Sequence, residues 1–305
     1  RKVIIMENKH LETMLKEVNK YNYSIVKPIV PFKNIRGRDE ELKMINQHLE
    51  KPHVALVTSK NIDKLDELSK SANKGIYVLV GEERVGIDKI IRALENERPK
   101  DSAIELDVDM LILNERKDTK DIKCITETLI KSFSDYETEM KKHNNDFRLF
   151  IYISNICKVV AYNNVIYSKD DFLILVEFLK TLNRRFDVIA SSTNTEFNVY
   201  LDNDDVWSDI KYIRPYLKRH NIEEISDDAT HEILKDILKD YKDKSNNPLF
   251  TDDIIDAVIK ENKIKTYDFE PSKSYITMLC MFIDYKEKNI PVTKERVQAY
   301  FKKWF

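Results

Sequence analysis

The stretch GIYVLVGEERVGIDKIIRAL, residues 75–94, decides the fold. Its apolar run Ile76–Val80 predicts a buried strand, Gly81 opens a loop, and a helix is expected to begin near Gly86. A strand, a Gly-x-x-x-x-Gly loop and a helix form the frame of a phosphate-binding loop. All four glycines of the chain lie between Gly37 and Gly86, which favours a single loop of this kind.

The residues that follow the second glycine lack the chemistry of such a loop. A Lys is needed there to reach the terminal phosphates, and a Ser or Thr is needed to hold magnesium. Here Ile87 places a hydrocarbon at the first position, and Asp88 places an anion at the second. Glu82 lies in the same loop and adds another negative charge. The alternative loop, Val54–Leu68, contains no glycine, so we prefer residues 76–94.

Composition limits the classes of function. The chain has 305 residues, 42% of them hydrophobic, which suits two domains with real cores. The net charge of −2 favours neither a nucleic-acid partner nor a membrane surface. No apolar run approaches the roughly 18 residues that span a bilayer, and no signal peptide is visible. The chain begins at Arg1, which is compatible with a fragment or a processed form.

Cysteine and histidine usage indicates the compartment and the metal content. The three cysteines, Cys124, Cys157 and Cys280, are odd in number and far apart. This predicts buried thiols in a reducing, intracellular compartment, either the cytoplasm or an organelle interior. The six histidines show no metal-ligand spacing, so no metal site is expected.

Hydrophobic periodicity predicts an α/β domain followed by a helical domain. Further strands are expected at 103–106, 147–153 and 187–190, and helices at 122–142 and 171–183. This alternation, with continuous apolar strands, is typical of a parallel sheet flanked by helices. After Pro215 the strands are expected to stop, and helices are expected at 227–241, 252–260, 272–286 and 293–305. The predicted organisation is an N-terminal arm or linker at 1–30, an α/β domain at 31–212 and a helical lid at 213–305.

Several stretches resemble, in order, the first AAA+ module of the Clp family of protein unfoldases. They are GRDEE at 37–41, GEERVGIDKI at 81–90, YISNIC at 152–157, IASSTNTEF at 189–197, NVYLDND at 198–204, EPSK at 270–273 and the segment Val292–Trp304. The resemblance covers roughly residues 30–305. It implies an AAA+ P-loop-type parallel sheet followed by a helical lid, and an ancestral ability to hydrolyse ATP.

The resemblance also assigns positions to the ATPase machinery. It places the phosphate-loop Lys and Thr at Ile87 and Asp88, and the strand-end Asp and Glu at Ser154 and Asn155. The arginine pair falls at Asp209 and Ile210. Of the polar positions, only the sensor at Thr193 is kept. We expect a vestigial nucleotide site with no catalytic residue and no metal, formed by Gly81, Glu82, Val85, Gly86, Ile87, Asp88, Ser154, Asn155 and Thr193.

Two further expectations follow from the same alignment. The family's aromatic pore loop corresponds to LNERKDTKD at 113–121, which has no Tyr, Phe or Gly, so a grip on threaded polypeptide is not expected. Gly81 and Ser154 are expected at the tips of adjoining strands. ATP or ADP binding is doubtful because anions surround the predicted phosphate position, so no cofactor is expected.

Three functions remain open. The first is a catalytically inactive Clp-like AAA+ domain that acts as a scaffold, or as a regulatory or assembly subunit, by binding protein partners such as active AAA+ subunits. The second is the degenerate first module of an ATP-driven unfoldase whose active second module lies outside this chain. The third is a P-loop-like domain repurposed for nucleic acid, which the net charge of −2 disfavours.

Overall fold

The computed structural model describes residues 2–19, 26–30, 35–50, 75–82, 85–108, 111, 121–161, 169–201, 213–262 and 273–304. The chain divides into two compact units. The α/β unit comprises residues 1–33, 40–82 and 90–222, and the helical unit comprises residues 34–39, 83–89 and 223–305. The stretches 54–68 and 113–120, and the positions Asp209 and Ile210, lie outside the described residues, whereas Asp121, at the end of the expected pore-loop segment, is the N-cap of α6 (Ile122–Lys141).

The α/β unit is built on a mostly parallel sheet in the order β1-β3-β4-β5-β2-β6. Its strands are β1 (Val26–Pro28), β2 (Ile76–Gly81), β3 (Ala103–Asp107), β4 (Phe150–Ser154), β5 (Asp187–Thr193) and β6 (Leu217–Asn221). The pairs β3–β4, β4–β5, β2–β5 and β2–β6 are parallel, and only β1–β3 is antiparallel among the pairs described. This confirms the predicted parallel sheet, with small shifts in the strand ends.

The two edge strands were not predicted. The expectation that strands stop after Pro215 is wrong, because β6 pairs with β2 through five residues. Its sequence, LKRHN, is mostly polar because this edge strand is largely solvent-accessible, so it carries no apolar signal. At the other edge, β1 pairs with β3, and Pro28 is tolerated because an edge strand need not donate every backbone hydrogen bond. The predicted N-terminal arm therefore contributes to the α/β unit.

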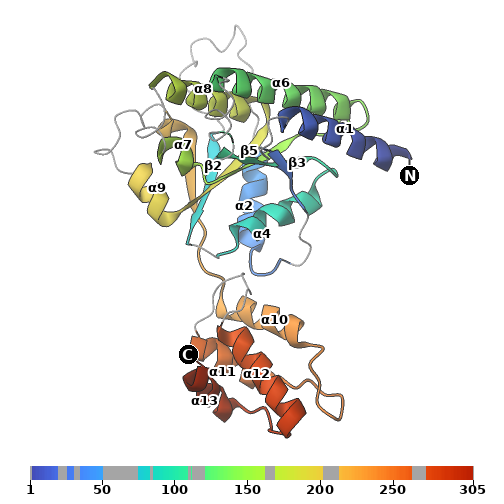
Figure 1. Ribbon diagram of the computed structural model, residues 1–305, viewed down its shortest axis with the longest axis vertical. Helices are drawn as coiled ribbons and strands as arrows, with labels where there is room; N and C mark the ends of the chain where they lie inside the picture. Colours follow the sequence, from blue (N-terminus) through green and yellow to red (C-terminus); the bar gives the residue numbers. More distant parts are fainter. Residues whose placement is uncertain are drawn as a thin grey trace. The chain divides into compact units, whose positions relative to one another are not determined.

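Helices cover both faces of the sheet (Figure 1). One face carries α1 (Lys2–Val18), α6 (Ile122–Lys141) and α8 (Lys169–Arg185), and the other carries α2 (Asp39–Leu49) and α4 (Ile87–Leu94). Shorter elements are 3-10 helices at Glu95–Glu97 and Arg214–Tyr216, α7 (Cys157–Ala161) and α9 (Asn194–Tyr200). Because side chains alternate along a strand, β2 serves both layers.

The two faces of β2 bury different groups. Ile76, Val78 and Val80 join the core formed with α1, α6 and α8. Tyr77 stacks between two histidine rings, with centroids 4.7 Å from His48 of α2 and 5.2 Å from His220 of β6. The buried strand predicted at Ile76–Val80 is therefore confirmed, while the aromatic stack also requires β6, which was not predicted.

The helical unit contains α10 (Asp227–Leu238), α11 (Asp252–Asn262), α12 (Lys273–Lys288) and α13 (Lys294–Trp304). These confirm the four predicted helices. Their core includes Leu234, Ile255, Val258, Met281 and Val297. The hydroxyl of Ser226 caps α10 by accepting a 3.1 Å hydrogen bond from the backbone N–H of Ala229.

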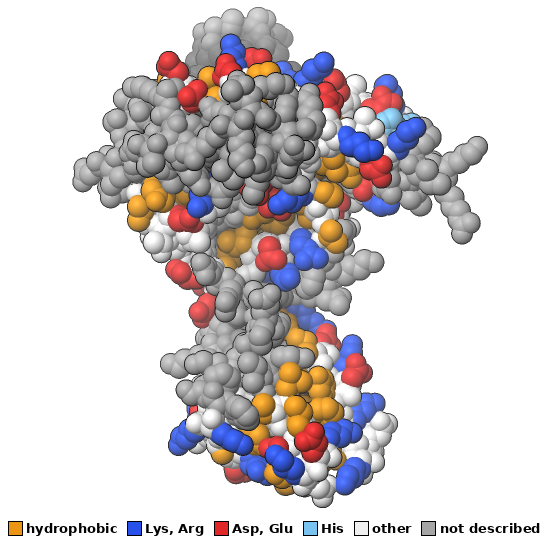
Figure 2. All heavy atoms as spheres, in the orientation of Figure 1, with side chains coloured by type: hydrophobic (Ala, Val, Ile, Leu, Met, Phe, Trp, Pro, Cys, Tyr) orange, Lys and Arg blue, Asp and Glu red, His pale blue; other side chains and the backbone are white. Residues whose placement is uncertain are grey.

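The face of the molecule drawn in Figure 2 has no large patch of a single charge among the described residues. On the face drawn in Figure 2, basic and acidic side chains are interspersed over the described surface. Among the helices that the structure describes, none combines the length and apolarity needed to cross a membrane. Cys157 is buried, Cys280 is half-buried and Cys124 is exposed, so the expectation of buried thiols is wrong for Cys124, whose position on α6 faces solvent.

Arg38 of the GRDEE segment contacts Val85, in the loop between Gly81 and Gly86. Both residues belong to the helical unit. Gly37 has φ +67°, and a Cβ built on it would lie 2.4 Å from the Cβ of Ala229. Arg38 is 2% exposed and donates from Nη2 to the carbonyl oxygen of Val85 at 2.7 Å. Arg36 forms ion pairs with Glu232, at 3.4 Å, and with Asp236. The tight turn at Gly37 therefore lets this segment reach both α10 and Val85.

A buried acid lies beside the amino ends of the strands. Glu95 is 5% exposed, and burial raises its pKa to about 8, with Arg98 opposing the shift and Asp101 adding to it. Arg98 is committed elsewhere, since its Nη2 donates to Asp187 at 3.0 Å and its guanidinium lies 4.8 Å from the centre of the Phe150 ring. Glu95 is therefore favoured in its protonated form in the folded protein.

We predict that Gly37→Ala destabilises the helical unit by roughly 2–5 kcal/mol, because it adds left-handed backbone strain to a steric clash. Urea denaturation followed by circular dichroism measures the change. Ala229→Gly is the matched control: in the double variant Gly37→Ala/Ala229→Gly the clash is gone, so the combined loss should be smaller than the sum of the single losses. A Gly37→Ala protein within about 0.5 kcal/mol of the parent would contradict the geometry.

We predict that Glu95 makes the protein less stable as the pH rises from about 4.5 to about 8. Over this window the folded state keeps a proton that the unfolded state releases, so the free energy of unfolding falls by at most about 1.4 kcal/mol per pH unit. Glu95→Gln should flatten this slope, as measured by urea denaturation at a series of pH values. The exposed Glu50→Gln serves as the control and should leave the slope unchanged. An identical slope in the parent and in Glu95→Gln would refute the prediction.

Candidate functional site

The carboxyl ends of β2, β4 and β5 form the candidate site edge. The neighbouring strands β2 and β5 connect in opposite directions across the sheet. The chain leaves β2 for β3, which lies past β5 and β4, and it leaves β5 for β6, which lies on the other side of β2. In open α/β sheets, ligands bind at the carboxyl ends of strands where neighbouring connections diverge in this way. Gly81, Ser154 and Thr193 are the last residues of these three strands.

The strand order brings Gly81 next to Thr193 rather than next to Ser154. Gly81 and Thr193 are direct partners in the β2–β5 register. The expectation that Gly81 and Ser154 end adjoining strands is wrong, because β5 lies between β2 and β4. Ser154 pairs instead with Asp107 across the β3–β4 ladder.

One carboxylate ties two of the predicted site residues together. Asn155 follows β4 with φ +50°, a conformation that asparagine tolerates, and its Nδ2 lies 3.0 Å from both carboxylate oxygens of Glu196. The Thr193 hydroxyl donates to the same carboxylate at 2.9 Å and accepts from the backbone N–H of Glu196 at 3.1 Å. The Asn155 amide N–H groups and the Thr193 hydroxyl are thus matched by Glu196, whereas the buried Oδ1 of Asn155 has no hydrogen-bond partner among the described residues.

Glu196 was not predicted as a site residue, although its signal is in the sequence. Thr193 and Glu196 have the Ser/Thr-x-x-Glu spacing of a capping box, and Thr193 is the N-cap of α9. This spacing predicts the contact between the two residues. It does not predict Asn155, which reaches Glu196 from another strand.

A second polar chain runs from Glu82 to β6. The side-chain amide of Asn194 donates to Glu82 at 3.0 Å, and its oxygen lies 3.4 Å from Nη2 of Arg219. Arg219 also donates to Asn198 at 2.8 Å, and its guanidinium lies 4.9 Å from the centre of the Phe197 ring. Arg219 was missed because β6 was missed. Its guanidinium group thus contacts the amide oxygens of Asn194 and Asn198 and the ring of Phe197, all on α9.

The remaining predicted residues lie in the loop and the first turn of α4. Val85 and Gly86 are buried, and Gly86 has φ +88°, which permits the turn into the helix. Ile87 is half-buried, whereas the side chain of Asp88 is 63% exposed and lies 3.7 Å from Nζ of Lys89. Glu83 and Arg84 lie outside the described residues.

These side chains do not fit a magnesium-bound triphosphate. Such a ligand needs a cation and a hydroxyl at the start of the helix, and an anion at the strand end to hold the metal water. The chain offers a hydrocarbon and a carboxylate at the first place, and Ser154 with an amide, Asn155, at the second. The backbone N–H groups at the start of α4 remain as the favourable element. The assignment of the nine residues to a nucleotide site stays a prediction.

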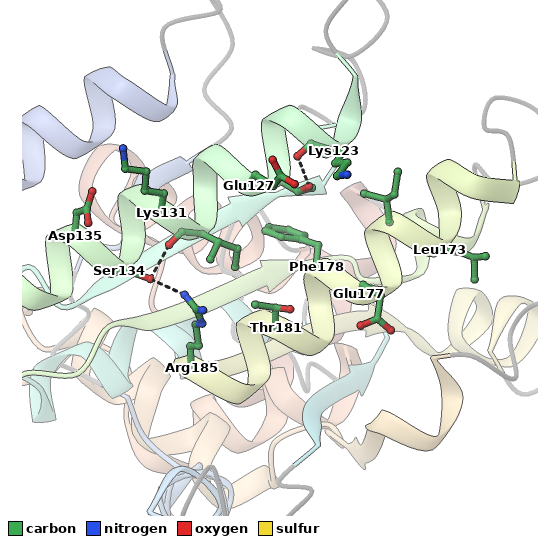
Figure 3. A pocket seen from close by; sticks show the side chains of 13 residues that line it. Lys123, Glu127, Lys131, Ser134, Asp135, Leu173, Glu177, Phe178, Thr181 and Arg185 are labelled. Carbon is green, nitrogen blue, oxygen red and sulfur yellow. Dashed lines mark hydrogen bonds between the residues drawn. The ribbon is translucent and has the colours of Figure 1, made fainter.

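A groove between α6 and α8 is a separate feature of the α/β unit (Figure 3). Its volume is about 750 Å³, and Ile130, Ile174 and Phe178 supply its apolar surface. Arg185 donates to Ser134 at 3.3 Å across it. The rim carries charges of both signs from Lys123, Glu127, Lys131, Asp135 and Glu177. Periodicity predicts the inward faces of these helices, but not that their outward apolar residues leave a hollow.

Comparisons with known proteins give no sequence match and several structural ones. No protein-family profile and no curated protein sequence matches the chain. The structure is similar to Hsp104 in a closed state with ATPγS and FITC casein, with a TM-score of 0.56 and 15% identity, over 94% of this chain and 45% of that one. It is also similar to the extended casein complex of S. cerevisiae Hsp104, with a TM-score of 0.51 and 16% identity over 90% of this chain and 41% of that one.

A third similar structure is a Walker-type ATPase of Pyrococcus abyssi, with a TM-score of 0.50 and 13% identity over 91% of this chain and 74% of that one. The chain spans less than half the length of the Hsp104 chains that it resembles. At these identities the likeness concerns the fold alone. The chain has the α/β fold of AAA+ ATPases, as the Clp resemblance in its sequence implies.

Proposed function

We propose that this chain is a catalytically inactive, Clp-like AAA+ domain that binds protein partners as a scaffold, or as a regulatory or assembly subunit. An active AAA+ subunit is one such partner. The domain holds no functional ATP site, and it contributes surface and shape rather than turnover.

The Glu196 network carries this proposal. ATP hydrolysis requires a free acid at the strand end to orient the metal and activate water. Here the strand end carries Asn155, whose amide donates to both oxygens of Glu196, and the Thr193 hydroxyl donates to the same group. Both oxygens of the Glu196 carboxylate are therefore engaged by donors of the protein itself. We therefore assign Glu196 a structural role: it links Asn155 to Thr193 and completes the capping box at the start of α9.

The electrostatics of the loop support the same conclusion. Removing the phosphate-loop cation and adding Asp88 changes the local charge by two units in the direction that repels a triphosphate. The side chain of Asp88 is 63% exposed, so solvent weakens the repulsion without reversing it. Lys89, 3.7 Å away, is paired with Asp88 and offsets its charge. Without the Lys, the metal ligands and the base, the remaining backbone N–H groups give weak anion attraction and no catalysis.

Protein partners suit the described surface better than nucleic acid does. Charges of both signs are interspersed on the face drawn in Figure 2, and the groove between α6 and α8 is apolar within a mixed-charge rim. Nucleic-acid sites require a concentrated basic surface. The structurally similar Hsp104 complexes contain casein, a protein.

One observation favours the second candidate function. The chain covers only 45% of the Hsp104 chain to which it is similar. Under this alternative, it is the degenerate first module of an ATP-driven unfoldase or chaperone whose active second module lies outside the residues considered. Under this alternative the first module would lack ATPase activity, while the second module would hydrolyse ATP. Sequencing of the full reading frame distinguishes the two: a downstream Gly-x-x-x-x-Gly-Lys-Thr loop with an Asp-Glu strand end would favour the alternative.

We predict that the purified chain shows no magnesium-dependent ATP hydrolysis in a phosphate-release assay. Ile87→Lys/Asp88→Thr should raise ATP affinity at least about tenfold in a fluorescent-nucleotide titration, because it restores one cation and removes one anion near the phosphates. This variant should still not hydrolyse ATP, because Ser154 and Asn155 are unchanged. Micromolar ATP affinity with magnesium-dependent turnover in the parent chain would end the proposal.

Glu196→Gln is the control for a hidden catalytic base. It retains the size of the side chain, so α9 should form as before, with a loss of roughly 1 kcal/mol or less from the weakened capping box. If the parent hydrolyses ATP and Glu196→Gln does not, Glu196 is a base and our reading of the network is wrong. If neither protein hydrolyses ATP while both remain folded by circular dichroism, the structural role of Glu196 holds.

A further inference from the structure

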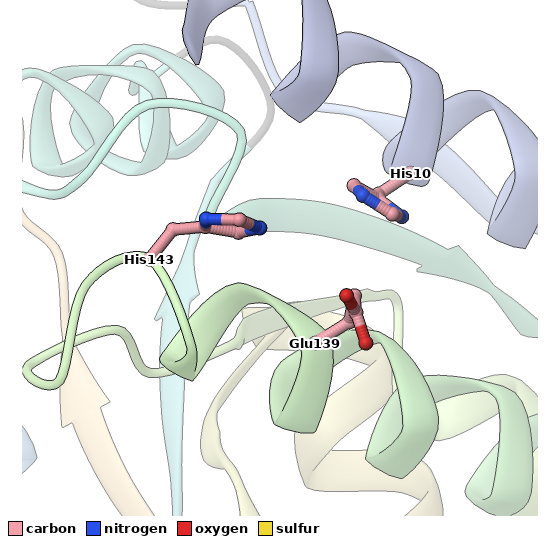
Figure 4. Close-up of side chains that lie close together, drawn as sticks. All are labelled: His10, Glu139 and His143. Atoms are coloured by element: carbon pink, nitrogen blue, oxygen red, sulfur yellow. The ribbon is translucent and has the colours of Figure 1, made fainter.

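Two histidines and a glutamate meet on the surface formed by α1 and α6 (Figure 4). His10 projects from α1, while Glu139 lies in the last turn of α6 and His143 just beyond it. One ligand atom from each residue lies within 4.8 Å of the others. The two imidazole rings are 6.3 Å apart between centroids and are inclined by 33°. The three side chains therefore surround a common point at the junction of the two helices.

The donor set has the chemistry of a zinc site. Zinc is bound by imidazole nitrogen and carboxylate oxygen at about 2.0–2.2 Å, and two histidines with one glutamate and a water complete a tetrahedron. Donors in such a tetrahedron lie roughly 3.3 Å from one another, so the present separation must shrink by about 1.5 Å. His143 is exposed and the other two side chains are half-buried. Side-chain rotations can therefore supply this movement.

Core packing holds the two ligand-bearing helices in place. Leu11 and Met14 of α1 are buried in the same core as Tyr136 and Met140 of α6. These residues adjoin the ligands in sequence: Leu11 follows His10, and Met140 follows Glu139. The proximity of His10 to Glu139 is thus a consequence of helix packing and not only of flexible side chains meeting in solvent. A site on two packed helices is more preorganised than one on a loop.

One competitor for the glutamate is present. Lys142 donates from Nζ to Oε2 of Glu139 at 2.5 Å. Lys142 contacts Oε2, so a metal ion can take Oε1 of the same carboxylate.

We propose that His10, Glu139 and His143 bind a divalent transition-metal ion, zinc being the best match, and that the ion joins α1 to α6. The histidine spacing in the sequence does not indicate this site, because His10 lies on α1, far from Glu139 and His143 in the chain. The pair Glu139 and His143, four residues apart at the end of a helix, is the local half of the signal. The site is separate from the carboxyl edge of the sheet and independent of nucleotide binding.

Zinc titration by isothermal calorimetry tests the site, with Co²⁺ absorption as a report on the donor atoms. We expect one Zn²⁺ per chain, and an affinity reduced at least about tenfold in each of His10→Asn, Glu139→Gln and His143→Asn. Binding should weaken as the pH falls, because histidine must be neutral to coordinate. Bound Co²⁺ should show a tetrahedral spectrum without a thiolate charge-transfer band, which excludes the exposed Cys124 as a ligand.

Two matched controls separate this site from others. Glu127→Gln removes an exposed acid from the same helix and should leave the affinity unchanged. His231→Asn removes a histidine that contacts Asp252 and Asp256 in the helical unit, and it should also have no effect. Loss of binding in His231→Asn, or in none of the three ligand variants, would overturn the proposal. No binding by the folded parent at roughly 1 mM Zn²⁺ would do the same.

Hydrogen exchange gives a second readout that does not depend on calorimetry. An ion bound only when α1 is docked stabilises the docked form by the factor 1 + [Zn²⁺]/Kd. At a hundredfold excess over Kd, the exchange of α1 amides that open by undocking should therefore slow about a hundredfold. In His10→Asn the same addition of zinc should leave α1 exchange unchanged. Equal protection in the parent and in His10→Asn would contradict the proposed link between the helices.

Discussion

The pairing of β2 on both sides is the constraint on which the α/β unit depends. β2 is hydrogen-bonded to β5 along one edge and to β6 along the other. Its alternate side chains serve two helical layers, so any change in its register would move apolar residues to the wrong face. This fixed register places Gly81 opposite Thr193. The sheet register therefore determines which residues lie together at the candidate edge. It also fixes the point at which the loop after Gly81 begins.

The arrangement of the sheet also explains why the polar side chains at the candidate edge contact one another. β4 and β5 end side by side, which brings Asn155 within reach of the first turn of α9. Glu196 at that turn accepts from Asn155 and Thr193, while Glu82 accepts from Asn194. In each case a carboxylate is matched by a neutral donor of the protein. These carboxylates are therefore balanced without a bound cation, whereas the buried Oδ1 of Asn155 has no partner among the described residues.

The sequence predicted those parts whose signal is local and apolar. Four of the strands and the helices of the helical unit follow from periodicity, and the AAA+ fold follows from ordered resemblances along the chain. β6 was missed because an edge strand such as LKRHN needs no apolar face. The contacts of Asn155 and Arg219, and the meeting of His10 with Glu139, join residues distant in sequence. Only the packing of helices and strands brings such pairs together, so no spacing rule could have found them.

The residues of the loop and of the first turn of α4 differ in how strongly the fold constrains them. Its frame residues have folding roles: Gly86 takes a positive φ, Val85 is buried, and the Val85 carbonyl is held by Arg38. Substitution at these positions strains the backbone or empties a packed site. Ile87 and Asp88 lie in the first turn of α4, where the chain tolerates other side chains and where an acid even suits the helix dipole. Substitution in this first turn is therefore expected to cost the fold little, whereas substitution of Gly86 is expected to cost much more.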